Sequence, residues 1–126
     1  MNAAEDEAFA PEVLALLSRE AEVDIETTSA SLAAHRATVW IVVVDGTPYL
    51  RSVRGDHGRW WRELSERGLG AIHVAGRRIP VRAAAADEAG TAACSAALRR
   101  KYAHDPSTPS MLRPEVLGTT LKLLPG

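Results

Sequence analysis

The sequence predicts a small antiparallel β-barrel with helices packed on its outside, an α+β fold in which strands dominate. About six segments show strand patterns, and most of them pair through short turns into hairpins. Only one predicted helix lies between adjacent central strands, whereas a parallel sheet needs a crossover between most of its strands. The chain has 126 residues, 46% of them hydrophobic and 25% charged. We therefore expect one globular domain over residues 1–126.

The first predicted elements follow an acidic N-terminus. Residues 1–26 contain eight acidic residues and one basic residue, and we expect an acidic helical segment over roughly 1–20. Its helix covers Pro11–Arg19, because proline suits the first helical position and an apolar stripe follows. Val23–Thr28 alternates and predicts a strand. Residues 29–36 fit either a loop or one helical turn.

The clearest strand signal is the apolar run TVWIVVV, Thr38–Val44. Apolar residues occupy both parities of this run, which predicts a central strand covered on both faces. Asp45-Gly46 is a hairpin signal, and Tyr49–Val53 is the expected returning strand. Thr47-Pro48 lengthens the connection, so we expect a loop of more than two residues.

A helix is predicted after this hairpin. Gly55 ends the strand, and Asp56 is expected to cap a helix that runs to about Arg67. Gly68 supplies the C-terminal stop, and Glu63 with Arg67 makes a favourable i,i+4 pair.

The C-terminal half predicts a second hairpin, a helix and a last strand. Residues 70–75 and 77–84 read as the two hairpin strands, with Pro80 indicating an edge strand or a bulge. Thr91–Tyr102 is an alanine-rich helix whose basic end suits the negative end of the helix dipole. Residues 119–125, TTLKLLP, close the chain as a strand.

Charge and motifs exclude several classes of function. The net charge is −1 and the isoelectric point about 6.4, which argues against nonspecific nucleic-acid binding. No apolar run is long enough to span a bilayer and no secretory signal is present, so we expect a cytoplasmic protein without a membrane partner. The single cysteine, Cys94, forms no internal disulfide or thiolate metal site. No metal-protease, P-loop, dinucleotide or nucleophile-elbow motif appears, so no metal site and no catalytic residue is predicted.

The positive charge is concentrated in one part of the chain. Residues 51–82 contain eight arginines against three acidic residues. Guanidinium groups suit phosphate and carboxylate ligands, so the excess predicts a small anionic ligand or an acidic partner. Its densest stretch is YLRSVRGDHGRWW, residues 49–61.

Strand and turn geometry divides the candidate residues of this stretch. Neighbouring strand residues point to opposite faces, so Ser52 and Arg54 share one face and Arg51 lies on the other. Ser52 and Arg54 are candidates to hold one phosphate; the alternative is that Ser52 fills a barrel position and the arginines lie in solvent. Gly55 precedes a helix whose first N–H groups suit an anion, unless Asp56 caps them.

Three further candidates follow in the same stretch. His57 is either a hydrogen-bond donor to a ligand or a solvent-exposed turn residue. Trp60 and Trp61 diverge by about 100° on a helix, so one belongs to the core. The other tryptophan covers a ligand, contacts a partner subunit or lies over the barrel.

The order of these motifs resembles domain-of-unknown-function family 2255, an uncharacterised bacterial family. The resemblance rests on VWIVVVDGTPYLRSVRGDHGRWWRELSERG, on a downstream A-x-x-x-KY segment and on the closing TLKLLP. It covers residues 20–125 approximately.

A more distant resemblance links the same order of elements to split-barrel flavoproteins, which include pyridoxamine-phosphate-oxidase-like flavin binders and deazaflavin-dependent nitroreductases. It implies an FMN-binding-like split β-barrel, a homodimer, and redox chemistry on a small molecule with FMN or a deazaflavin. It also implies cofactor-binding roles for Arg51, Ser52, Arg54, Gly55, His57, Trp60 and Trp61. The chain lacks the Ser-Arg-Lys loop of many such oxidases. A cofactor-free barrel for a small ligand, or a cofactor-independent enzyme with an apolar substrate in the barrel mouth, therefore stays open.

Overall fold

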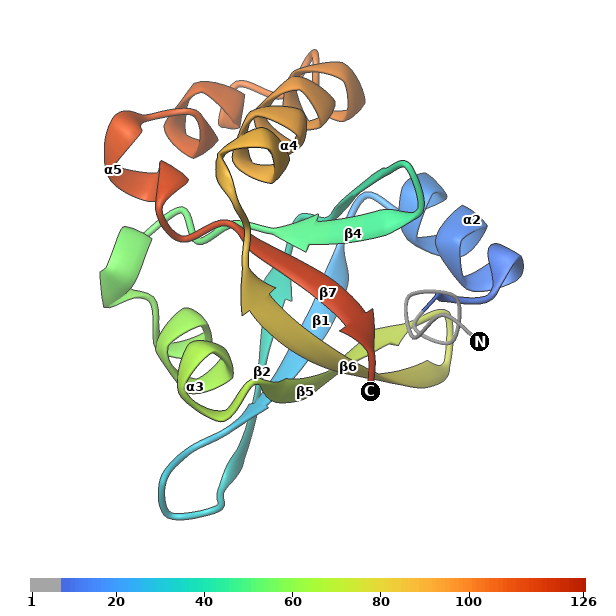
Figure 1. Ribbon diagram of the computed structural model, residues 1–126, viewed down its shortest axis with the longest axis vertical. Helices are drawn as coiled ribbons and strands as arrows, with labels where there is room; N and C mark the ends of the chain where they lie inside the picture. The colour runs from blue at the N-terminus through green and yellow to red at the C-terminus, as the bar shows by residue number, and fades with distance from the viewer. Residues whose placement is uncertain (1–7) are drawn as a thin grey trace.

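The computed structural model describes residues 8–126, so the first seven residues of the expected acidic segment lie outside the described part of the chain. Seven strands form one antiparallel sheet in the order β2-β1-β5-β6-β7-β4-β3. The sheet curls, and the helices lie around its outside (Figure 1). This confirms the predicted antiparallel architecture.

The bounds of most elements follow local sequence signals. The strands are β1 Val23–Thr28, β2 Ala34–Val39, β3 Val42–Val44, β4 Thr47–Leu50, β5 Leu69–Val74, β6 Arg77–Ala85 and β7 Leu121–Pro125. The helices are α2 Pro11–Arg19, α3 Arg59–Arg67, α4 Glu88–Lys101 and the short α5 Pro114–Leu117. Two 3-10 turns cover Gly55–His57 and Thr108–Met111. None of the helices in this described part is long and apolar enough to cross a membrane.

The predicted central strand Thr38–Val44 is wrong. The segment instead forms β2 up to Val39 and β3 from Val42, and these two strands are the opposite edges of the sheet. Trp40 and Ile41 join them, so the two edges of the curled sheet converge at this link. Both parities are apolar because the chain bends between two partners: Val23 of β1 pairs with Val39, and Tyr49 of β4 pairs with Val42.

Two predictions for the hairpins also need correction. Residues 29–36 contain the start of β2, which pairs with β1 from Ala34 onward. The turn after β3 has only two residues, Asp45 and Gly46, and both have positive φ, as a type I′ turn requires. Pro48 is tolerated inside β4 because β7 pairs with this strand only from Tyr49.

The prediction of an edge strand or bulge at Pro80 is wrong, since β6 lies between β5 and β7. The Pro80 carbonyl accepts a hydrogen bond from the Gly126 N–H, just past the end of β7. In an antiparallel strand, the N–H and the C=O of one residue lie on the same side. Pro80 therefore lacks an N–H on the side that faces the end of β7, where few ladder hydrogen bonds are lost.

The start of α3 differs from the prediction, whereas its end agrees. The N-cap is Gly58, and no side chain caps the helix; Asp56 lies in the preceding 3-10 turn and is exposed. Gly68 ends the helix in the left-handed region at φ 71°, as predicted. Glu63 bonds to Arg59, one turn earlier, in place of the expected Arg67. In α4 the cap is Asp87, whose carboxylate accepts from the Gly90 N–H, so this helix begins before Thr91.

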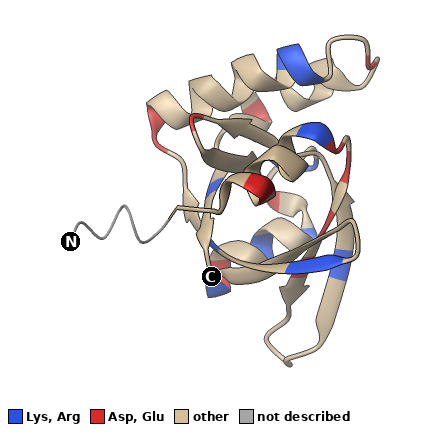
Figure 2. Ribbon diagram, turned by 90° about the vertical axis from the view of Figure 1, so that its right-hand side faces the viewer, with Lys and Arg blue, Asp and Glu red and all other residues tan. Residues whose placement is uncertain are grey.

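The main core lies inside the curled sheet, beneath α2 and α3. Its fully buried side chains include Leu17 of α2, Ile25 of β1, Leu64 of α3 and Ile72 of β5. A second cluster packs α4 against β3 and contains the buried Cys94. Figure 2 shows acidic and basic residues interspersed over several elements in this view.

The end of α4 holds the link between β2 and β3. Tyr102 stacks on Trp40, with ring centroids 4.0 Å apart and planes 9° from parallel. The Tyr102 hydroxyl donates to the Ala21 carbonyl at 2.7 Å and lies 3.3 Å from the Ile41 N–H. Lys101 Nζ donates to the carbonyls of Leu17 and Ile41 at 3.0 and 2.7 Å. The Lys-Tyr pair therefore fixes the converging edges of the sheet.

Stability is expected to rise between pH 8 and 9 because of Lys101. Burial lowers the pKa of Lys101 from 10.5 to about 8. The unfolded chain therefore binds more protons than the folded chain from pH 8 to 10.5, and the free energy of unfolding rises with pH in that window. Urea unfolding between pH 7.5 and 9 measures this rise. Burial raises the pKa of the Cys94 thiol from 9.0 to about 11, so above pH 9 this thiol lowers the free energy of unfolding and opposes the effect of Lys101.

Lys101→Met should remove the rise, whereas Lys122→Met, the same change at an exposed lysine of β7, should keep it. An equal slope in all three proteins would contradict the assignment to Lys101.

Candidate functional site

Two adjoining cavities lie where β1 and β2 meet the segment between β4 and α3. The larger has a volume of about 590 Å³ and is lined by β1, β2, residues 52–54 and the start of α3. The smaller has a volume of about 310 Å³ and lies toward Trp40 and Met111. Both are lined by Thr38, Val53 and Trp60, so these residues form the wall between them. Volumes of this size are typical of small-molecule sites.

The Ser52 hydroxyl is the most informative polar group of the larger cavity. Ser52 is only 1% exposed, and its Oγ has no hydrogen-bond partner within residues 8–126. The backbone of Gly58 lies beside it, since a Cβ added at Gly58 would fall 2.5 Å from Ser52 Oγ. Only glycine allows this approach. A buried hydroxyl without a partner costs free energy unless a ligand or water completes its bonding.

The N-terminus of α3 lies beside this hydroxyl. Gly58 and Arg59 line the cavity, and no side chain caps the helix, so its first N–H groups remain available. The positive end of a helix dipole and free N–H groups together favour an anion. The predicted competition from the Asp56 carboxylate is absent here, because Asp56 is not the cap.

Arginines supply the charge of the larger cavity. Arg36 of β2, Arg54 and Arg59 of α3 line it, and Arg54 has no hydrogen bond or ion pair to any residue between 8 and 126. Ser52 and Arg54 thus line the same cavity, but strand parity is not the reason: the returning strand ends at Leu50 and not at Val53 as predicted, and Val53 lines this cavity too. This arrangement is suited to a phosphate or carboxylate group.

Arg51, just past the end of β4, points toward α4 and does not line the larger cavity, and it is 2% exposed. Its guanidinium donates to the hydroxyls of Thr120 and Ser95 and to the carbonyls of Met111 and Thr91, all at 2.9 to 3.0 Å. Burial lowers the pKa of Arg51 from its ordinary value. The side chain borders the smaller cavity, but four of its donors are engaged in joining β4 to α4 and to the segment before β7.

The prediction that only one tryptophan belongs to the core is wrong, because Trp60 and Trp61 are both half-buried and both pack against the main core. Trp60 also lines both cavities, whereas Trp61 lines neither. The Trp61 indole N–H is buried without a partner among the described residues. Gly55 and His57 line neither cavity: Gly55 turns the chain at φ 63°, and the His57 side chain is 89% exposed. A cofactor-binding role for any of these residues stays a prediction.

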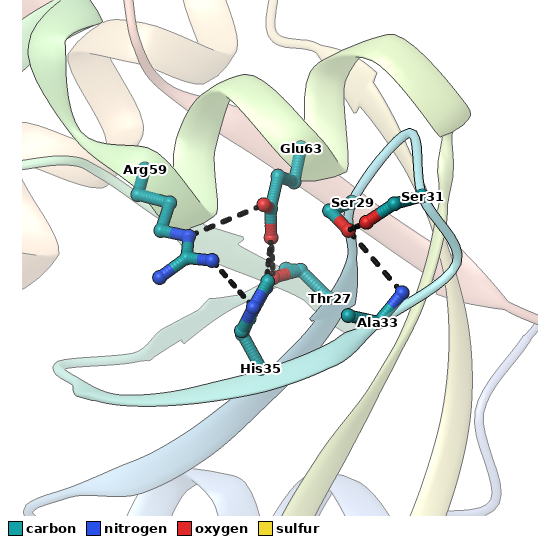
Figure 3. Close-up of polar contacts among 7 residues, drawn as sticks. All are labelled: Thr27, Ser29, Ser31, Ala33, His35, Arg59 and Glu63. Carbon is teal, nitrogen blue, oxygen red and sulfur yellow. Dashed lines mark hydrogen bonds and ion pairs between the residues drawn. The ribbon is translucent and has the colours of Figure 1, made fainter.

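Sequence reasoning missed a hydrogen-bonded cluster at the wall of the larger cavity (Figure 3). Glu63 of α3 accepts from Thr27 Oγ1 at 2.8 Å and lies 3.1 Å from His35 Nδ1. Arg59 Nε donates to the other carboxylate oxygen at 3.3 Å, and its terminal nitrogen contacts His35 Nε2. The members come from β1, β2 and α3, so no pattern in neighbouring residues of the sequence connects them. The sequence feature that could have indicated the cluster is Glu63, a charged residue on the inward face of α3.

The Glu63 carboxylate is held in its ionised form. Burial alone raises the pKa of Glu63, but hydrogen bonds from Thr27, His35 and Arg59 outweigh burial and bring the pKa below its ordinary value. Glu63 is thus a fixed negative charge behind a positively charged cavity.

Solved structures with the same fold identify the architecture. A putative pyridoxamine 5′-phosphate oxidase from Listeria innocua superposes with a TM-score of 0.63 and 16% identity, covering 90% of each chain. An F420 reductase gives 0.58 and 14% identity, covering 88% of this chain and 89% of that one. HutZ, a haem storage protein from Vibrio cholerae, gives 0.62 and 11% identity, covering 94% and 91%. The fold is therefore a split β-barrel like that of pyridoxamine-phosphate-oxidase-like proteins.

Sequence comparison identifies the family more narrowly. No curated protein matches the chain. The family model described as "Uncharacterized protein conserved in bacteria (DUF2255)" matches residues 13–123, which include both cavities and the Lys-Tyr pair. The chain belongs to the DUF2255 family of bacterial proteins.

Proposed function

We propose that this protein is a single-domain split barrel that binds a phosphorylated flavin or deazaflavin and supports redox chemistry on a small molecule. The observation that carries the proposal is the buried, unpartnered Ser52 hydroxyl at the open N-terminus of α3. The flavin-related neighbours of the same fold support the choice of ligand.

The residues present fit the phosphate end of such a cofactor. Ser52 Oγ and the first N–H groups of α3 would donate hydrogen bonds to the phosphate. The Arg54 guanidinium would donate a pair of charged hydrogen bonds to it. Because Arg54 is exposed and unpaired within residues 8–126, it can turn toward a ligand without breaking a contact.

The residues around Trp60 fit the ring end. Trp60 borders both cavities, so a planar group reaching from one to the other would pass its indole. A bound flavin or deazaflavin supplies hydride transfer, while the chain binds, orients and shields it. Val53, 45% exposed on the same wall, would be covered by the ligand or by a second copy, and we include a homodimer in the proposal.

Haem, which the Vibrio protein stores, is less well supported at this site. His35 is the histidine lining the larger cavity, and both its ring nitrogens are engaged, by Glu63 and Arg59. A second candidate is binding of a small anionic ligand without redox chemistry. The observation that favours this second candidate is that the anion-binding groups lie together in the larger cavity, where Trp60 is the aromatic residue among the lining residues.

Titration with FMN and with a deazaflavin, followed by fluorescence quenching, tests the proposal. Ser52→Ala and Arg54→Ala should each weaken binding by about 10-fold or more, the loss expected for one hydrogen bond to a charged group. Ser52→Ala should leave the unfolding temperature unchanged or raise it, because it removes an unsatisfied buried hydroxyl.

Arg62→Ala, an exposed change on α3 that lines neither cavity, is the matched control and should bind like the unmodified protein. Failure of the unmodified protein to bind either cofactor would refute the redox proposal. Binding of simple phosphate esters in that case would support the second candidate. A Soret band shift with haem would favour a haem-binding protein. Light scattering reports whether the protein is dimeric.

A further inference from the structure

The hydrogen-bond geometry assigns one tautomer to His35. Arginine has only donors, so His35 Nε2 must be the acceptor in its contact with Arg59. The proton of the neutral ring therefore lies on Nδ1 and is donated to Glu63 Oε1, at 3.1 Å. A carboxylate that fixes an imidazole tautomer leaves the second nitrogen free for proton exchange.

Hydrogen bonds to Glu63 hold the carboxylate that orients the His35 imidazole. Glu63 is 13% exposed and accepts from three donors, with Thr27 Oγ1 the nearest at 2.8 Å. Thr27 is 1% exposed and lies directly opposite His35 in the pairing of β1 with β2. The ring orientation is therefore set by two strands and a helix (Figure 3).

Arg59 is the adjustable member of the cluster. Its side chain is 62% exposed, its Nε lies 3.3 Å from Glu63, and it lines the larger cavity at the start of α3. An anion bound at the helix N-terminus competes with His35 and Glu63 for this guanidinium. Once Arg59 turns to the anion, Nε2 of His35 is left without a donor.

We propose that His35 exchanges a proton with the ligand in the larger cavity, and that Arg59 covers its Nε2 until an anionic group of the ligand draws the guanidinium away. In the step itself, the Nε2–H bond of the imidazolium formed on anion binding breaks, its electron pair stays on the nitrogen, and the proton forms a new X–H bond with a basic atom X of the ligand. The Nδ1–H bond to Glu63 remains. The inference rests on the ligand site of the proposed function and names His35 as a catalytic residue.

The charges around His35 favour protonation once a ligand is bound. From α3 the ring faces Glu63 and Arg59, and from β1 it faces the uncharged Thr27. Arg36 and Arg54 line the same cavity and would be neutralised by the anion. Withdrawal of Arg59 and arrival of an anion both stabilise the imidazolium, so anion binding should take up a proton.

Calorimetric titration in two buffers of different ionisation enthalpy measures this uptake. FMN and sulfate are the two probes; sulfate does not itself titrate near neutral pH. The unmodified protein should take up more protons on binding than His35→Gln, and its affinity should fall more steeply as the pH rises. Arg62→Gln is the matched control and should behave like the unmodified protein.

The outcomes separate this inference from the proposed function. If FMN fails to bind but sulfate binds with a His35-dependent uptake, the redox proposal fails and the inference stands. If either probe binds with equal uptake in the unmodified protein and His35→Gln, the inference is overturned. It is also overturned if neither probe binds. Nitrogen-15 shifts of His35 give an independent check, because a ligand-free ring protonated on Nε2 contradicts the contact with Arg59.

Discussion

Arg51→Ala should lower the free energy of unfolding by about 3 to 5 kcal/mol, because each buried acceptor left without a donor costs about 1 to 3 kcal/mol. The substitution removes a buried guanidinium and leaves four acceptors without their donor: the hydroxyls of Thr120 and Ser95 and the carbonyls of Met111 and Thr91. These groups come from α4, from the second 3-10 turn and from the residues just before β7. Their loss therefore loosens three parts of the molecule at once.

Urea unfolding of Arg51→Ala, Arg51→Lys and Arg77→Ala measures this effect. Lysine keeps the charge but has a single nitrogen, so it cannot reproduce the spread of a guanidinium and should recover only part of the loss. Arg77 is exposed at the β5–β6 hairpin and should change stability by less than about 0.5 kcal/mol. A loss below about 1 kcal/mol in Arg51→Ala would show that the network contributes little.

Tyr102→Ala should lower the free energy of unfolding by about 3 to 5 kcal/mol, as truncation of a buried aromatic side chain does. Tyr102→Phe should cost only about 1 to 2 kcal/mol, because it keeps the ring stacked on Trp40 and removes the hydroxyl alone. That hydroxyl bonds to Ala21, just before β1, and to Ile41, in the link between β2 and β3. The difference between the two variants separates stacking from hydrogen bonding.

Tyr49→Phe is the matched control for this pair. The Tyr49 hydroxyl has no hydrogen bond to any residue between 8 and 126, so its removal should change stability by less than about 0.5 kcal/mol. Thermal and urea unfolding of the three variants check the ranking. Equal losses in Tyr102→Phe and Tyr49→Phe would contradict a role for the Tyr102 hydroxyl in closing the sheet.

Much of the fold follows from short-range chemistry that is readable in the chain. The α2 helix begins at Pro11 as expected, β1 has the expected bounds, and Gly68 ends α3 in the left-handed conformation. Each of these follows from the geometry of a few consecutive residues.

Other features depend on partners far away in the sequence. The apolar run around Trp40 gives no sign that its halves join opposite edges of the sheet, because that depends on pairing with β1 and β4. Arg51 reads as a ligand-binding arginine until Thr120 and Ser95, 69 and 44 residues away, are seen to surround it.

The same reason explains the proton-exchange site. His35 and Glu63 are 28 residues apart, and His35 falls in a segment that predicts a loop or a helical turn. Composition and periodicity are enough to predict a strand-rich barrel with an anion-binding stretch at residues 49–61. Which arginine is buried, which faces the cavity and which histidine lies beside it depend on tertiary packing, since only the packing of α3 on the β1–β2 hairpin brings Glu63 to His35.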